Sequence, residues 1–183
     1  MNKKLSIIFS FYNEEKNIKK SIHEVSLVLN KIPNLDYELI YVNDTSTDDS
    51  LKILKQENLI NNKVKIINLS RRFGHMAGIM AGLKNCIGDA AIYLDIDLQD
   101  PPDLIKEMVH SWVNENYDVV FTTRKKREQQ WFMKFITKIG YKILEKTSYI
   151  NMAKDSGDFR LISRKVIDQY VGFKEINPFF RFL

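Results

Sequence analysis

The sequence of 183 residues is poor in the residue types that define several classes of protein. Its single cysteine, Cys86, excludes an internal disulfide framework and a zinc site of clustered cysteines. Four prolines and seven glycines are too few for a collagen-like or low-complexity chain. No apolar run reaches the roughly 18 residues that a membrane-spanning helix requires, and the opening MNKKLSIIFSFYNEEK lacks the long apolar core of a secretory signal. We therefore expect one globular domain in a reducing compartment.

The net charge is also small, because 28 Lys and Arg residues are nearly balanced by 23 Asp and Glu residues, which leaves a formal charge of +5. One basic cluster stands out, made of Arg124, Lys125, Lys126 and Arg127. Such a cluster is typical of a solvated surface, and it also suits phosphate, anionic lipid or nucleic acid. The sequence leaves both interpretations open at this point.

Short apolar runs alternate with helical patterns along most of the chain. The runs predict strands at 5–11, 37–42, 64–69, 90–94 and 118–123, and the patterns predict helices at 14–31, 48–57, 76–86, 101–114 and 129–147. Parallel strands need crossover connections of this length, so the sequence predicts a mostly parallel sheet with helices on both faces. The segment after residue 155 does not continue the alternation.

Polar side chains follow three of the predicted strands. They are Tyr12, Asn13 and Glu14 after the first, Asn43 and Asp44 after the second, and Asp95 and Asp97 after the fourth. Open parallel sheets bind ligands beyond the carboxyl ends of their strands. We therefore expect these residues to converge on one ligand site.

The two carboxylates of Asp95 and Asp97 carry like charges that repel each other at close range. A hard divalent ion such as Mg²⁺ or Mn²⁺ removes the conflict, because it prefers oxygen ligands and commonly takes one or two carboxylates plus substrate phosphates. The alternative is an acidic loop in which Asp100 caps a helix that begins at Pro101 and Pro102.

Six motifs, taken together, resemble one known family. IIFSFYNEE, YVNDTSTDDS, LSRRFGHMAGIMAGL, YLDIDLQDPPDLI, VVFTTRKKR and DSGDFRLISRKV occur in the order seen in family 2 glycosyltransferases. The chain looks most like the polyprenyl-phosphate type, which includes bactoprenol glucosyltransferases and, more distantly, dolichol-phosphate mannose synthases. The resemblance implies an α/β GT-A fold and one catalytic domain over residues 1–183. Relatives of this type usually continue into transmembrane helices, so the chain is either cut before them or naturally short.

The resemblance also implies roles for individual residues. Donor binding would fall to Tyr12, Glu14, Asp44, Asp95 and Arg124. The metal, Mg²⁺ or Mn²⁺, would be held by the DxD pair Asp95 and Asp97 together with Gln99. The catalytic carboxylates would be Asp158, Asp97 and Asp95, with Asp158 either positioning the acceptor or, in the alternative reading, pairing with Arg160. The sequence departs from the family at Ser10, Phe11, Asn43 and Thr45.

The implied reaction is an inverting, metal-dependent transfer of a sugar from a UDP-glucose-like donor to polyprenyl (undecaprenyl) phosphate in cell-envelope glycan synthesis. The implied place is the cytoplasmic face of the inner membrane, with no nucleic-acid partner. Arg124, Lys125, Lys126 and Arg127, with Trp131 in the following helix, would contact the bilayer, although a core-facing helix is the alternative. Other readings are a glycosyltransferase with a saccharide hydroxyl acceptor and a domain that binds nucleotide-sugar without turnover.

Three minor features carry expectations of their own. Gly74, Gly78 and Gly82 recur every four residues, which favours close packing of a helix on the sheet. Arg71 or Arg72 is a candidate for a nucleotide phosphate, while the histidines at 23, 75 and 110 have no evident partners and are expected to be structural or exposed. No G-x-G-x-x-G follows the first predicted strand, so a dinucleotide-dependent oxidoreductase has no support.

Overall fold

A computed structural model of the chain describes residues 2–123 and 156–172. Its strands are β1 (Lys3–Phe11), β2 (Leu35–Asn43), β3 (Val64–Asn68), β4 (Ala90–Tyr93), β5 (Val119–Thr123) and β6 (Ser156–Ser163). Its helices are α1 (Glu15–Leu29), α2 (Ser50–Ile60), α3 (His75–Asn85), α4 (Leu104–Asn114) and α6 (Arg164–Val171). The predicted helix at 129–147 lies outside the described residues. The other predicted elements are confirmed, most with ends within two residues.

The strands form one sheet in the order β3-β2-β1-β4-β6-β5. The first four in this order are parallel, and β6 is antiparallel to both of its neighbours. The mostly parallel sheet is therefore confirmed, but β6 was not predicted. It enters between β4 and β5, so the fifth predicted strand does not lie beside the fourth.

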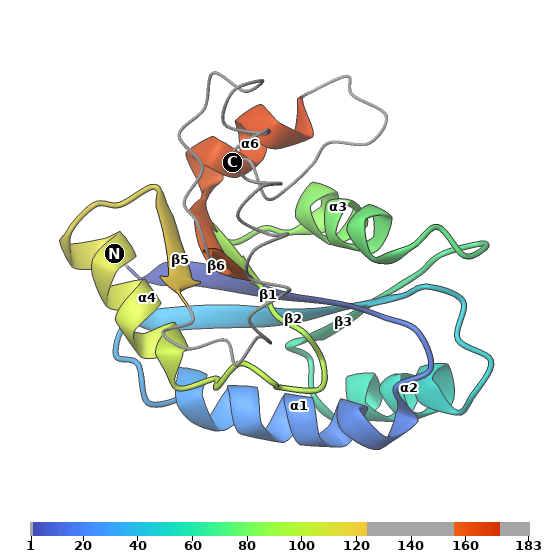
Figure 1. The fold of residues 1–183 in the computed structure, drawn as a ribbon. Coiled ribbons are helices and arrows are strands. Elements are labelled where there is room, and N and C mark those ends of the chain that lie inside the picture. The colour runs from blue at the N-terminus through green and yellow to red at the C-terminus, as the bar shows by residue number, and fades with distance from the viewer. Residues whose placement is uncertain (1, 124–155, 173–183) are drawn as a thin grey trace, which may run out of the picture.

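Helices cover both faces of the sheet, as Figure 1 shows, with α1 and α2 below it and α3 and α6 above it. Side chains that alternate along each strand build a core on each face. Ile7 and Phe9 of β1 pack with α1, α2 and α4, whereas Ile8 packs with α3 and α6. In α1 the predicted apolar face is buried, with Ile18, Val25 and Leu29 fully covered. Burial of each such side chain contributes about 1.5–3 kcal/mol.

Helix α3 packs unusually close to β1 because it presents glycine to the sheet. A Cβ at Gly78 would lie 2.0 Å from Ser10 Oγ, and a Cβ at Gly82 would lie 2.4 Å from Ile8 Cγ2. Two of the three recurring glycines thus allow the close packing that their spacing predicted. The third, Gly74, precedes the helix and has a φ of +92°.

Helix α4 begins three residues later than the sequence predicted. The carbonyls of Pro101 and Pro102 accept hydrogen bonds from the backbone N–H groups of Leu104 and Ile105, so the prolines form a turn ahead of the helix. Asp103, not Asp100, occupies the N-cap position, and its side chain makes no capping hydrogen bond. The expectation that Asp100 caps this helix is therefore wrong.

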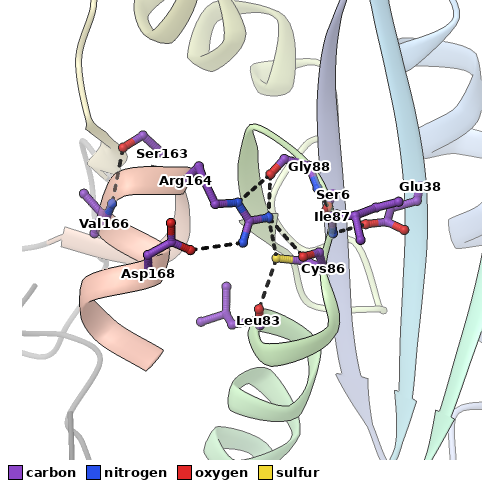
Figure 2. A network of polar contacts seen from close by, with 10 residues as sticks. All are labelled: Ser6, Glu38, Leu83, Cys86, Ile87, Gly88, Ser163, Arg164, Val166 and Asp168. Carbon is purple, nitrogen blue, oxygen red and sulfur yellow. Dashed lines mark hydrogen bonds and ion pairs between the residues drawn. The ribbon is translucent and has the colours of Figure 1, made fainter. Parts of the chain in front are cut away.

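A polar network ties α6 to the end of α3, at the edge where β1 and β4 begin (Figure 2). The Arg164 guanidinium donates to the carbonyl oxygens of Gly88 (2.9 Å from Nε) and Cys86 (3.0 Å from Nη2), and it lies 3.5 Å from the Asp168 carboxylate. The buried Glu38 carboxylate accepts from Ser6 Oγ at 2.7 Å and from the N–H of Ile87 at 2.8 Å. Arg164 thus pairs backbone carbonyls of the turn after α3, and Glu38 pairs a backbone N–H of the same turn.

Among the helices in the described parts of the chain, none combines the length and the apolar character needed to cross a membrane.

Candidate functional site

A cavity of about 260 Å³ opens at the carboxyl ends of β1, β2 and β4. The residues that line it include Tyr12, Glu14, Asp44, Arg72, Asp95 and Asp97. The structure therefore brings together, from three strand ends, four of the five residues that the sequence proposed for donor binding, and it places Asp97 of the proposed metal pair beside them. Convergence at this edge follows from the parallel arrangement of the strands.

The first wall of the cavity is the loop after β1, which is tied to the loop after β2. The N–H of Asn13 donates to Ser46 Oγ at 2.9 Å, and Asn13 Oδ1 accepts from the N–H of Thr47 at 2.8 Å. The N–H of Glu14 donates to Ser50 Oγ at 3.0 Å. These bonds fix the position of Tyr12 and Glu14 relative to β2.

Asp48 extends the same connection to the start of α2. Its carboxylate accepts from the N–H groups of Ser50 (3.0 Å) and Glu15 (3.1 Å). Partial burial raises the pKa of Asp48, but the hydrogen bonds from the side chain and backbone of Ser50 and from the backbone of Glu15 outweigh it, so the net pKa lies below its ordinary value. Asp49 occupies the N-cap position of α2 and its side chain makes no capping hydrogen bond, so the carboxylate of Asp48, one residue earlier, pairs the first N–H of the helix instead.

Asp44 is 3% exposed and holds the loop between β3 and α3. Its two carboxylate oxygens accept from the N–H groups of Phe73 (2.7 Å) and Gly74 (2.9 Å). An ionised carboxylate offers about four acceptor positions, so Asp44 retains capacity for a ligand. The sequence proposed Asp44 for the nucleoside and gave no sign of this second contact.

Two arginines of the β3–α3 loop take different positions. The Arg72 guanidinium lies 3.8 Å from the centroid of the Tyr12 ring and lines the cavity, in cation–π geometry. The Arg71 guanidinium lies 4.8 Å from the Phe73 ring centroid and is not among the cavity residues. Of the two candidates for a nucleotide phosphate, the structure places only Arg72 at the site.

His75 is a site residue that sequence reasoning missed. It begins α3, lines the cavity, and its Nε2 lies 3.8 Å from Asp95 Oδ1. Its position in the sequence could have revealed it, because His75 follows the third predicted strand, whose carboxyl end lies at the same edge of the sheet as the carboxylates. His110 behaves as expected for a surface residue, with Nδ1 3.6 Å from Glu115 Oε1.

Asp95 and Asp97 lie in a turn after β4, not on an extended strand. The N–H of Leu98 donates to the Asp95 carbonyl at 3.2 Å, and Leu98 has a φ of +57°. The N–H of Gln99 donates to Asp97 Oδ1 at 3.2 Å, while Gln99 is exposed and absent from the cavity lining. The turn thus brings both residues into the lining of the cavity.

Asp95 and Asp97 are the carboxylates of the described cavity that the sequence assigned to a metal. In the described residues, no three or more His, Cys, Asp or Glu side chains group closely enough to hold a metal ion by themselves. The pair Asp95 and Asp97 nevertheless fits a Mg²⁺ or Mn²⁺ ion, because such ions take one or two carboxylates and complete their shell with substrate phosphates.

Several predicted site residues cannot be placed in the same detail. Arg124, Lys125, Lys126, Arg127 and Trp131 lie outside the described residues. Asp158 lies in β6, where the backbone is described and the side chain is not. Because Arg160 pairs with Tyr93 at the end of β4, Asp158 falls beyond that end, at the edge that holds the cavity.

The strand order, the layers and the strand-end cavity define the class of the protein as a GT-A type α/β fold. The mannosyltransferase PcManGT from Pyrobaculum calidifontis, solved in complex with GDP-Man and Mn²⁺, has this fold. It superposes with a TM-score of 0.65 at 15% identity, covering 94% of this chain and 48% of that one.

Sequence comparison then gives the family. The model of glycosyl transferase family 2 matches residues 6–171, and the chain belongs to this family. It is 43% identical over 177 residues to the "Uncharacterized glycosyltransferase YkcC" of Bacillus subtilis (strain 168), covering 96% of this chain and 54% of that protein. It is 34% identical over 177 residues to the undecaprenyl-phosphate 4-deoxy-4-formamido-L-arabinose transferase of Proteus mirabilis (strain HI4320), again covering 96% and 54%. The chain thus spans about half the length of these relatives.

Proposed function

We propose that this chain is a catalytic domain, over residues 1–183, that transfers a sugar from a nucleotide-sugar of the UDP-glucose type to a polyprenyl phosphate during cell-envelope glycan synthesis. The observation that carries the proposal is the convergence of Tyr12, Asp44, Asp95 and Asp97 on one cavity. The relative that acts on undecaprenyl phosphate supports the choice of acceptor. The nucleotide-sugar and Mn²⁺ bound by PcManGT support the choice of donor and metal.

The donor would lie with its nucleoside between the first two strand ends and its diphosphate near Asp97. The Tyr12 ring offers a flat face to the base, and Glu14 and Asp44 offer acceptors for base N–H or ribose hydroxyl groups. Arg72, together with Arg124 from the segment that follows β5, would neutralise the charge of the phosphates. Asp95 would lie near the ribose and sugar, with His75 beside it.

Asp95 and Asp97, with help from Gln99, would hold Mg²⁺ or Mn²⁺. When bound, the ion supplies positive charge to the diphosphate leaving group. The residues of the chain orient the two substrates so that an acceptor phosphate oxygen attacks the anomeric carbon while the bond to the diphosphate breaks. Such positioning and charge stabilisation are commonly the largest contributions to catalysis.

The acceptor needs little activation. The second pKa of a phosphate monoester is about 6, so the group is mostly a dianion at neutral pH. We therefore assign Asp158 to positioning of the acceptor rather than to strong base catalysis. The basic cluster Arg124, Lys125, Lys126 and Arg127, together with Trp131, would hold this part of the chain at the cytoplasmic face of the inner membrane.

Thermal-shift measurements with UDP-, GDP- and dTDP-sugars, with and without Mn²⁺, test the donor site. A ligand at 100 times its Kd adds about 2.7 kcal/mol of stability, which corresponds to a rise in Tm of about 5 to 10 °C for a chain of this size. We expect one donor to stand out and Asp97→Ala to abolish its metal-dependent part. The matched control is Asp103→Ala, which removes an exposed carboxylate of the same segment. A metal-dependent shift that survives Asp97→Ala contradicts the assignment.

Product analysis tests the acceptor. Transfer to undecaprenyl phosphate must give a lipid-linked phosphosugar, and transfer to a saccharide hydroxyl instead would exclude the polyprenyl assignment. Donor binding without any transfer or hydrolysis would favour a non-catalytic domain.

A further inference from the structure

Besides the cluster at 124–127, a second stretch of the chain carries basic residues and no acidic ones. Residues 61–88 contain five Lys and Arg residues and no Asp or Glu. This stretch forms β3, which is the edge strand of the sheet, and α3 above it. The strand and the helix that adjoin the cavity on this side therefore carry a local excess of positive charge, although Lys63 is paired with Asp36 at 3.4 Å.

At the tip of this stretch, the loop between β3 and α3 exposes large apolar side chains beside arginine. Phe73 is 49% exposed and Met76 is 41% exposed, and Arg71 is exposed next to the Phe73 ring. The loop is firmly held, because Asp44 accepts from the N–H groups of Phe73 and Gly74. Its base is held as well, since the N–H of Leu69 donates to the Asn43 carbonyl at 3.0 Å. The backbone thus fixes an aromatic side chain in a water-facing position.

We propose that Arg71, Phe73 and Met76 form a docking surface for an anionic lipid bilayer, placed next to the donor cavity. Arginine above lipid phosphates with aromatic and thioether groups in the interfacial layer is the composition that such a surface requires. Arg72 lies in the same loop but faces the cavity, so the loop joins the bilayer contact to the donor site. The inference rests on the proposed function for its choice of partner, since a polyprenyl phosphate presents its phosphate at the bilayer surface.

The most exposed apolar side chains of the described residues do not fit this role. Leu59 and Ile60, at 84% and 81% exposure, end α2 on the other face of the sheet. They lie at the edge where β3 begins, opposite the edge that holds the cavity. A bilayer docked there would not reach the donor site.

Vesicle sedimentation of the 183-residue chain tests the proposal. Vesicles of phosphatidylglycerol and phosphatidylcholine are compared with vesicles of phosphatidylcholine alone. We expect Arg71→Ser with Phe73→Ser to weaken binding to the anionic vesicles about tenfold, since one basic residue alone contributes roughly fivefold. The matched control is Lys55→Ser with Leu59→Ser on α2, which removes one cation and one large apolar side chain and should change binding less than about twofold. Equal losses in both variants, or no loss in either, overturn the proposal.

Further measurements distinguish binding to a bilayer from binding to a free anion. They also distinguish the role of the docking surface from that of the donor site. Phe73→Ser and Met76→Ser alone must each weaken vesicle binding. If only Arg71→Ser does so, and inorganic polyphosphate or a single-stranded oligonucleotide competes fully, the loop binds anions and the bilayer proposal fails. The donor thermal shift should persist in the Arg71→Ser, Phe73→Ser variant, which also shows that it folds. Loss of that shift overturns an independent docking role, whereas vesicle binding without any donor shift in the wild type refutes the proposed function alone.

Discussion

The close approach of α3 to β1 gives the sharpest test of the packing behind the site. In Gly78→Ala, the added Cβ would lie 2.0 Å from Ser10 Oγ and 2.9 Å from Ser10 Cβ. Real Cβ atoms do not approach other heavy atoms so closely, so either α3 or β1 must shift. Ser10 lines the cavity, and α3 carries His75 at its start. The substitution should therefore disturb stability and donor binding together.

The expected magnitude comes from two opposed effects. Overpacking of a well-packed core costs about 1–3 kcal/mol, and the clash here is severe enough to place the cost near the upper end. Replacing a helical glycine by alanine returns about 1 kcal/mol through helix propensity. The net loss in the free energy of unfolding is then about 2 kcal/mol, or roughly 4–8 °C in Tm.

A second substitution identifies the clash as the cause. Ser10→Gly removes both atoms that lie within 3 Å of the new Cβ, and one of them is a buried hydroxyl oxygen that has no hydrogen-bond partner in the described part of the structure. Thermal and urea unfolding of both single variants and the double variant should show that Ser10→Gly rescues Gly78→Ala. Gly82→Ala is the control, because its Cβ meets Ile8 Cγ2 at 2.4 Å and not Ser10. Stabilisation by Gly78→Ala, or equal rescue of Gly82→Ala, would refute the packing argument.

Three further predictions concern the rest of the described structure. Arg164→Ala should lower the free energy of unfolding by about 1–3 kcal/mol, measured by urea titration, because the guanidinium donates to the carbonyls of Gly88 and Cys86. Arg164→Lys should recover only part of this loss, because one ammonium group cannot reproduce both hydrogen bonds. Because the pKa of Asp48 is lowered in the folded protein, its ionised carboxylate contributes fully to stability above the pKa of the unfolded state, and this contribution is lost as the pH falls through the pKa of the folded state. The Tm difference between wild type and Asp48→Asn should therefore shrink as the pH falls below about 4. A Tm difference that stays constant down to acidic pH would contradict this. Burial is the main reason that the pKa of Cys86 is raised, so a thiol reagent at neutral pH should modify it only as fast as the protein unfolds, and rapid labelling of the native chain would show that the thiol is accessible.

The central part of the fold was predictable because its signals are local. The apolar spacing of Ile18, Ile22, Val25 and Leu29 identifies the buried face of α1, and all four are buried. Polar residues directly after the first, second and fourth strands marked the edge where a parallel sheet places its ligands. Those strand ends supply Tyr12, Asp44 and Asp97 to the cavity.

The parts that were missed depend on contacts between distant segments. Strand β6 contains Arg160, a charged residue that is 2% exposed, and a buried charge conceals the apolar pattern of a strand. The role of His75 depends on the separation of α3 from the turn after β4, which no local pattern encodes. Helix α4 begins later than predicted because Pro101 and Pro102 can form either the first turn of a helix or a separate turn before it. The hydrogen bonds of their carbonyl groups show that they form the separate turn.

Backbone strain at this edge links the fold to the proposed chemistry. Each loop that follows one of the four parallel strands contains a residue with positive φ: Asn13 (57°), Thr45 (60°), Gly74 (92°) and Leu98 (57°). For the residues other than glycine this conformation is unfavourable, most of all for β-branched Thr45, and it persists only where surrounding contacts impose it. Side-chain bonds such as that of Thr45 Oγ1 to the Leu69 carbonyl, at 3.1 Å, supply those contacts. The neighbouring loops thereby hold Tyr12, Asp44 and Asp97 in fixed directions before any ligand arrives, which is the preorganisation that charge stabilisation in a transfer reaction requires.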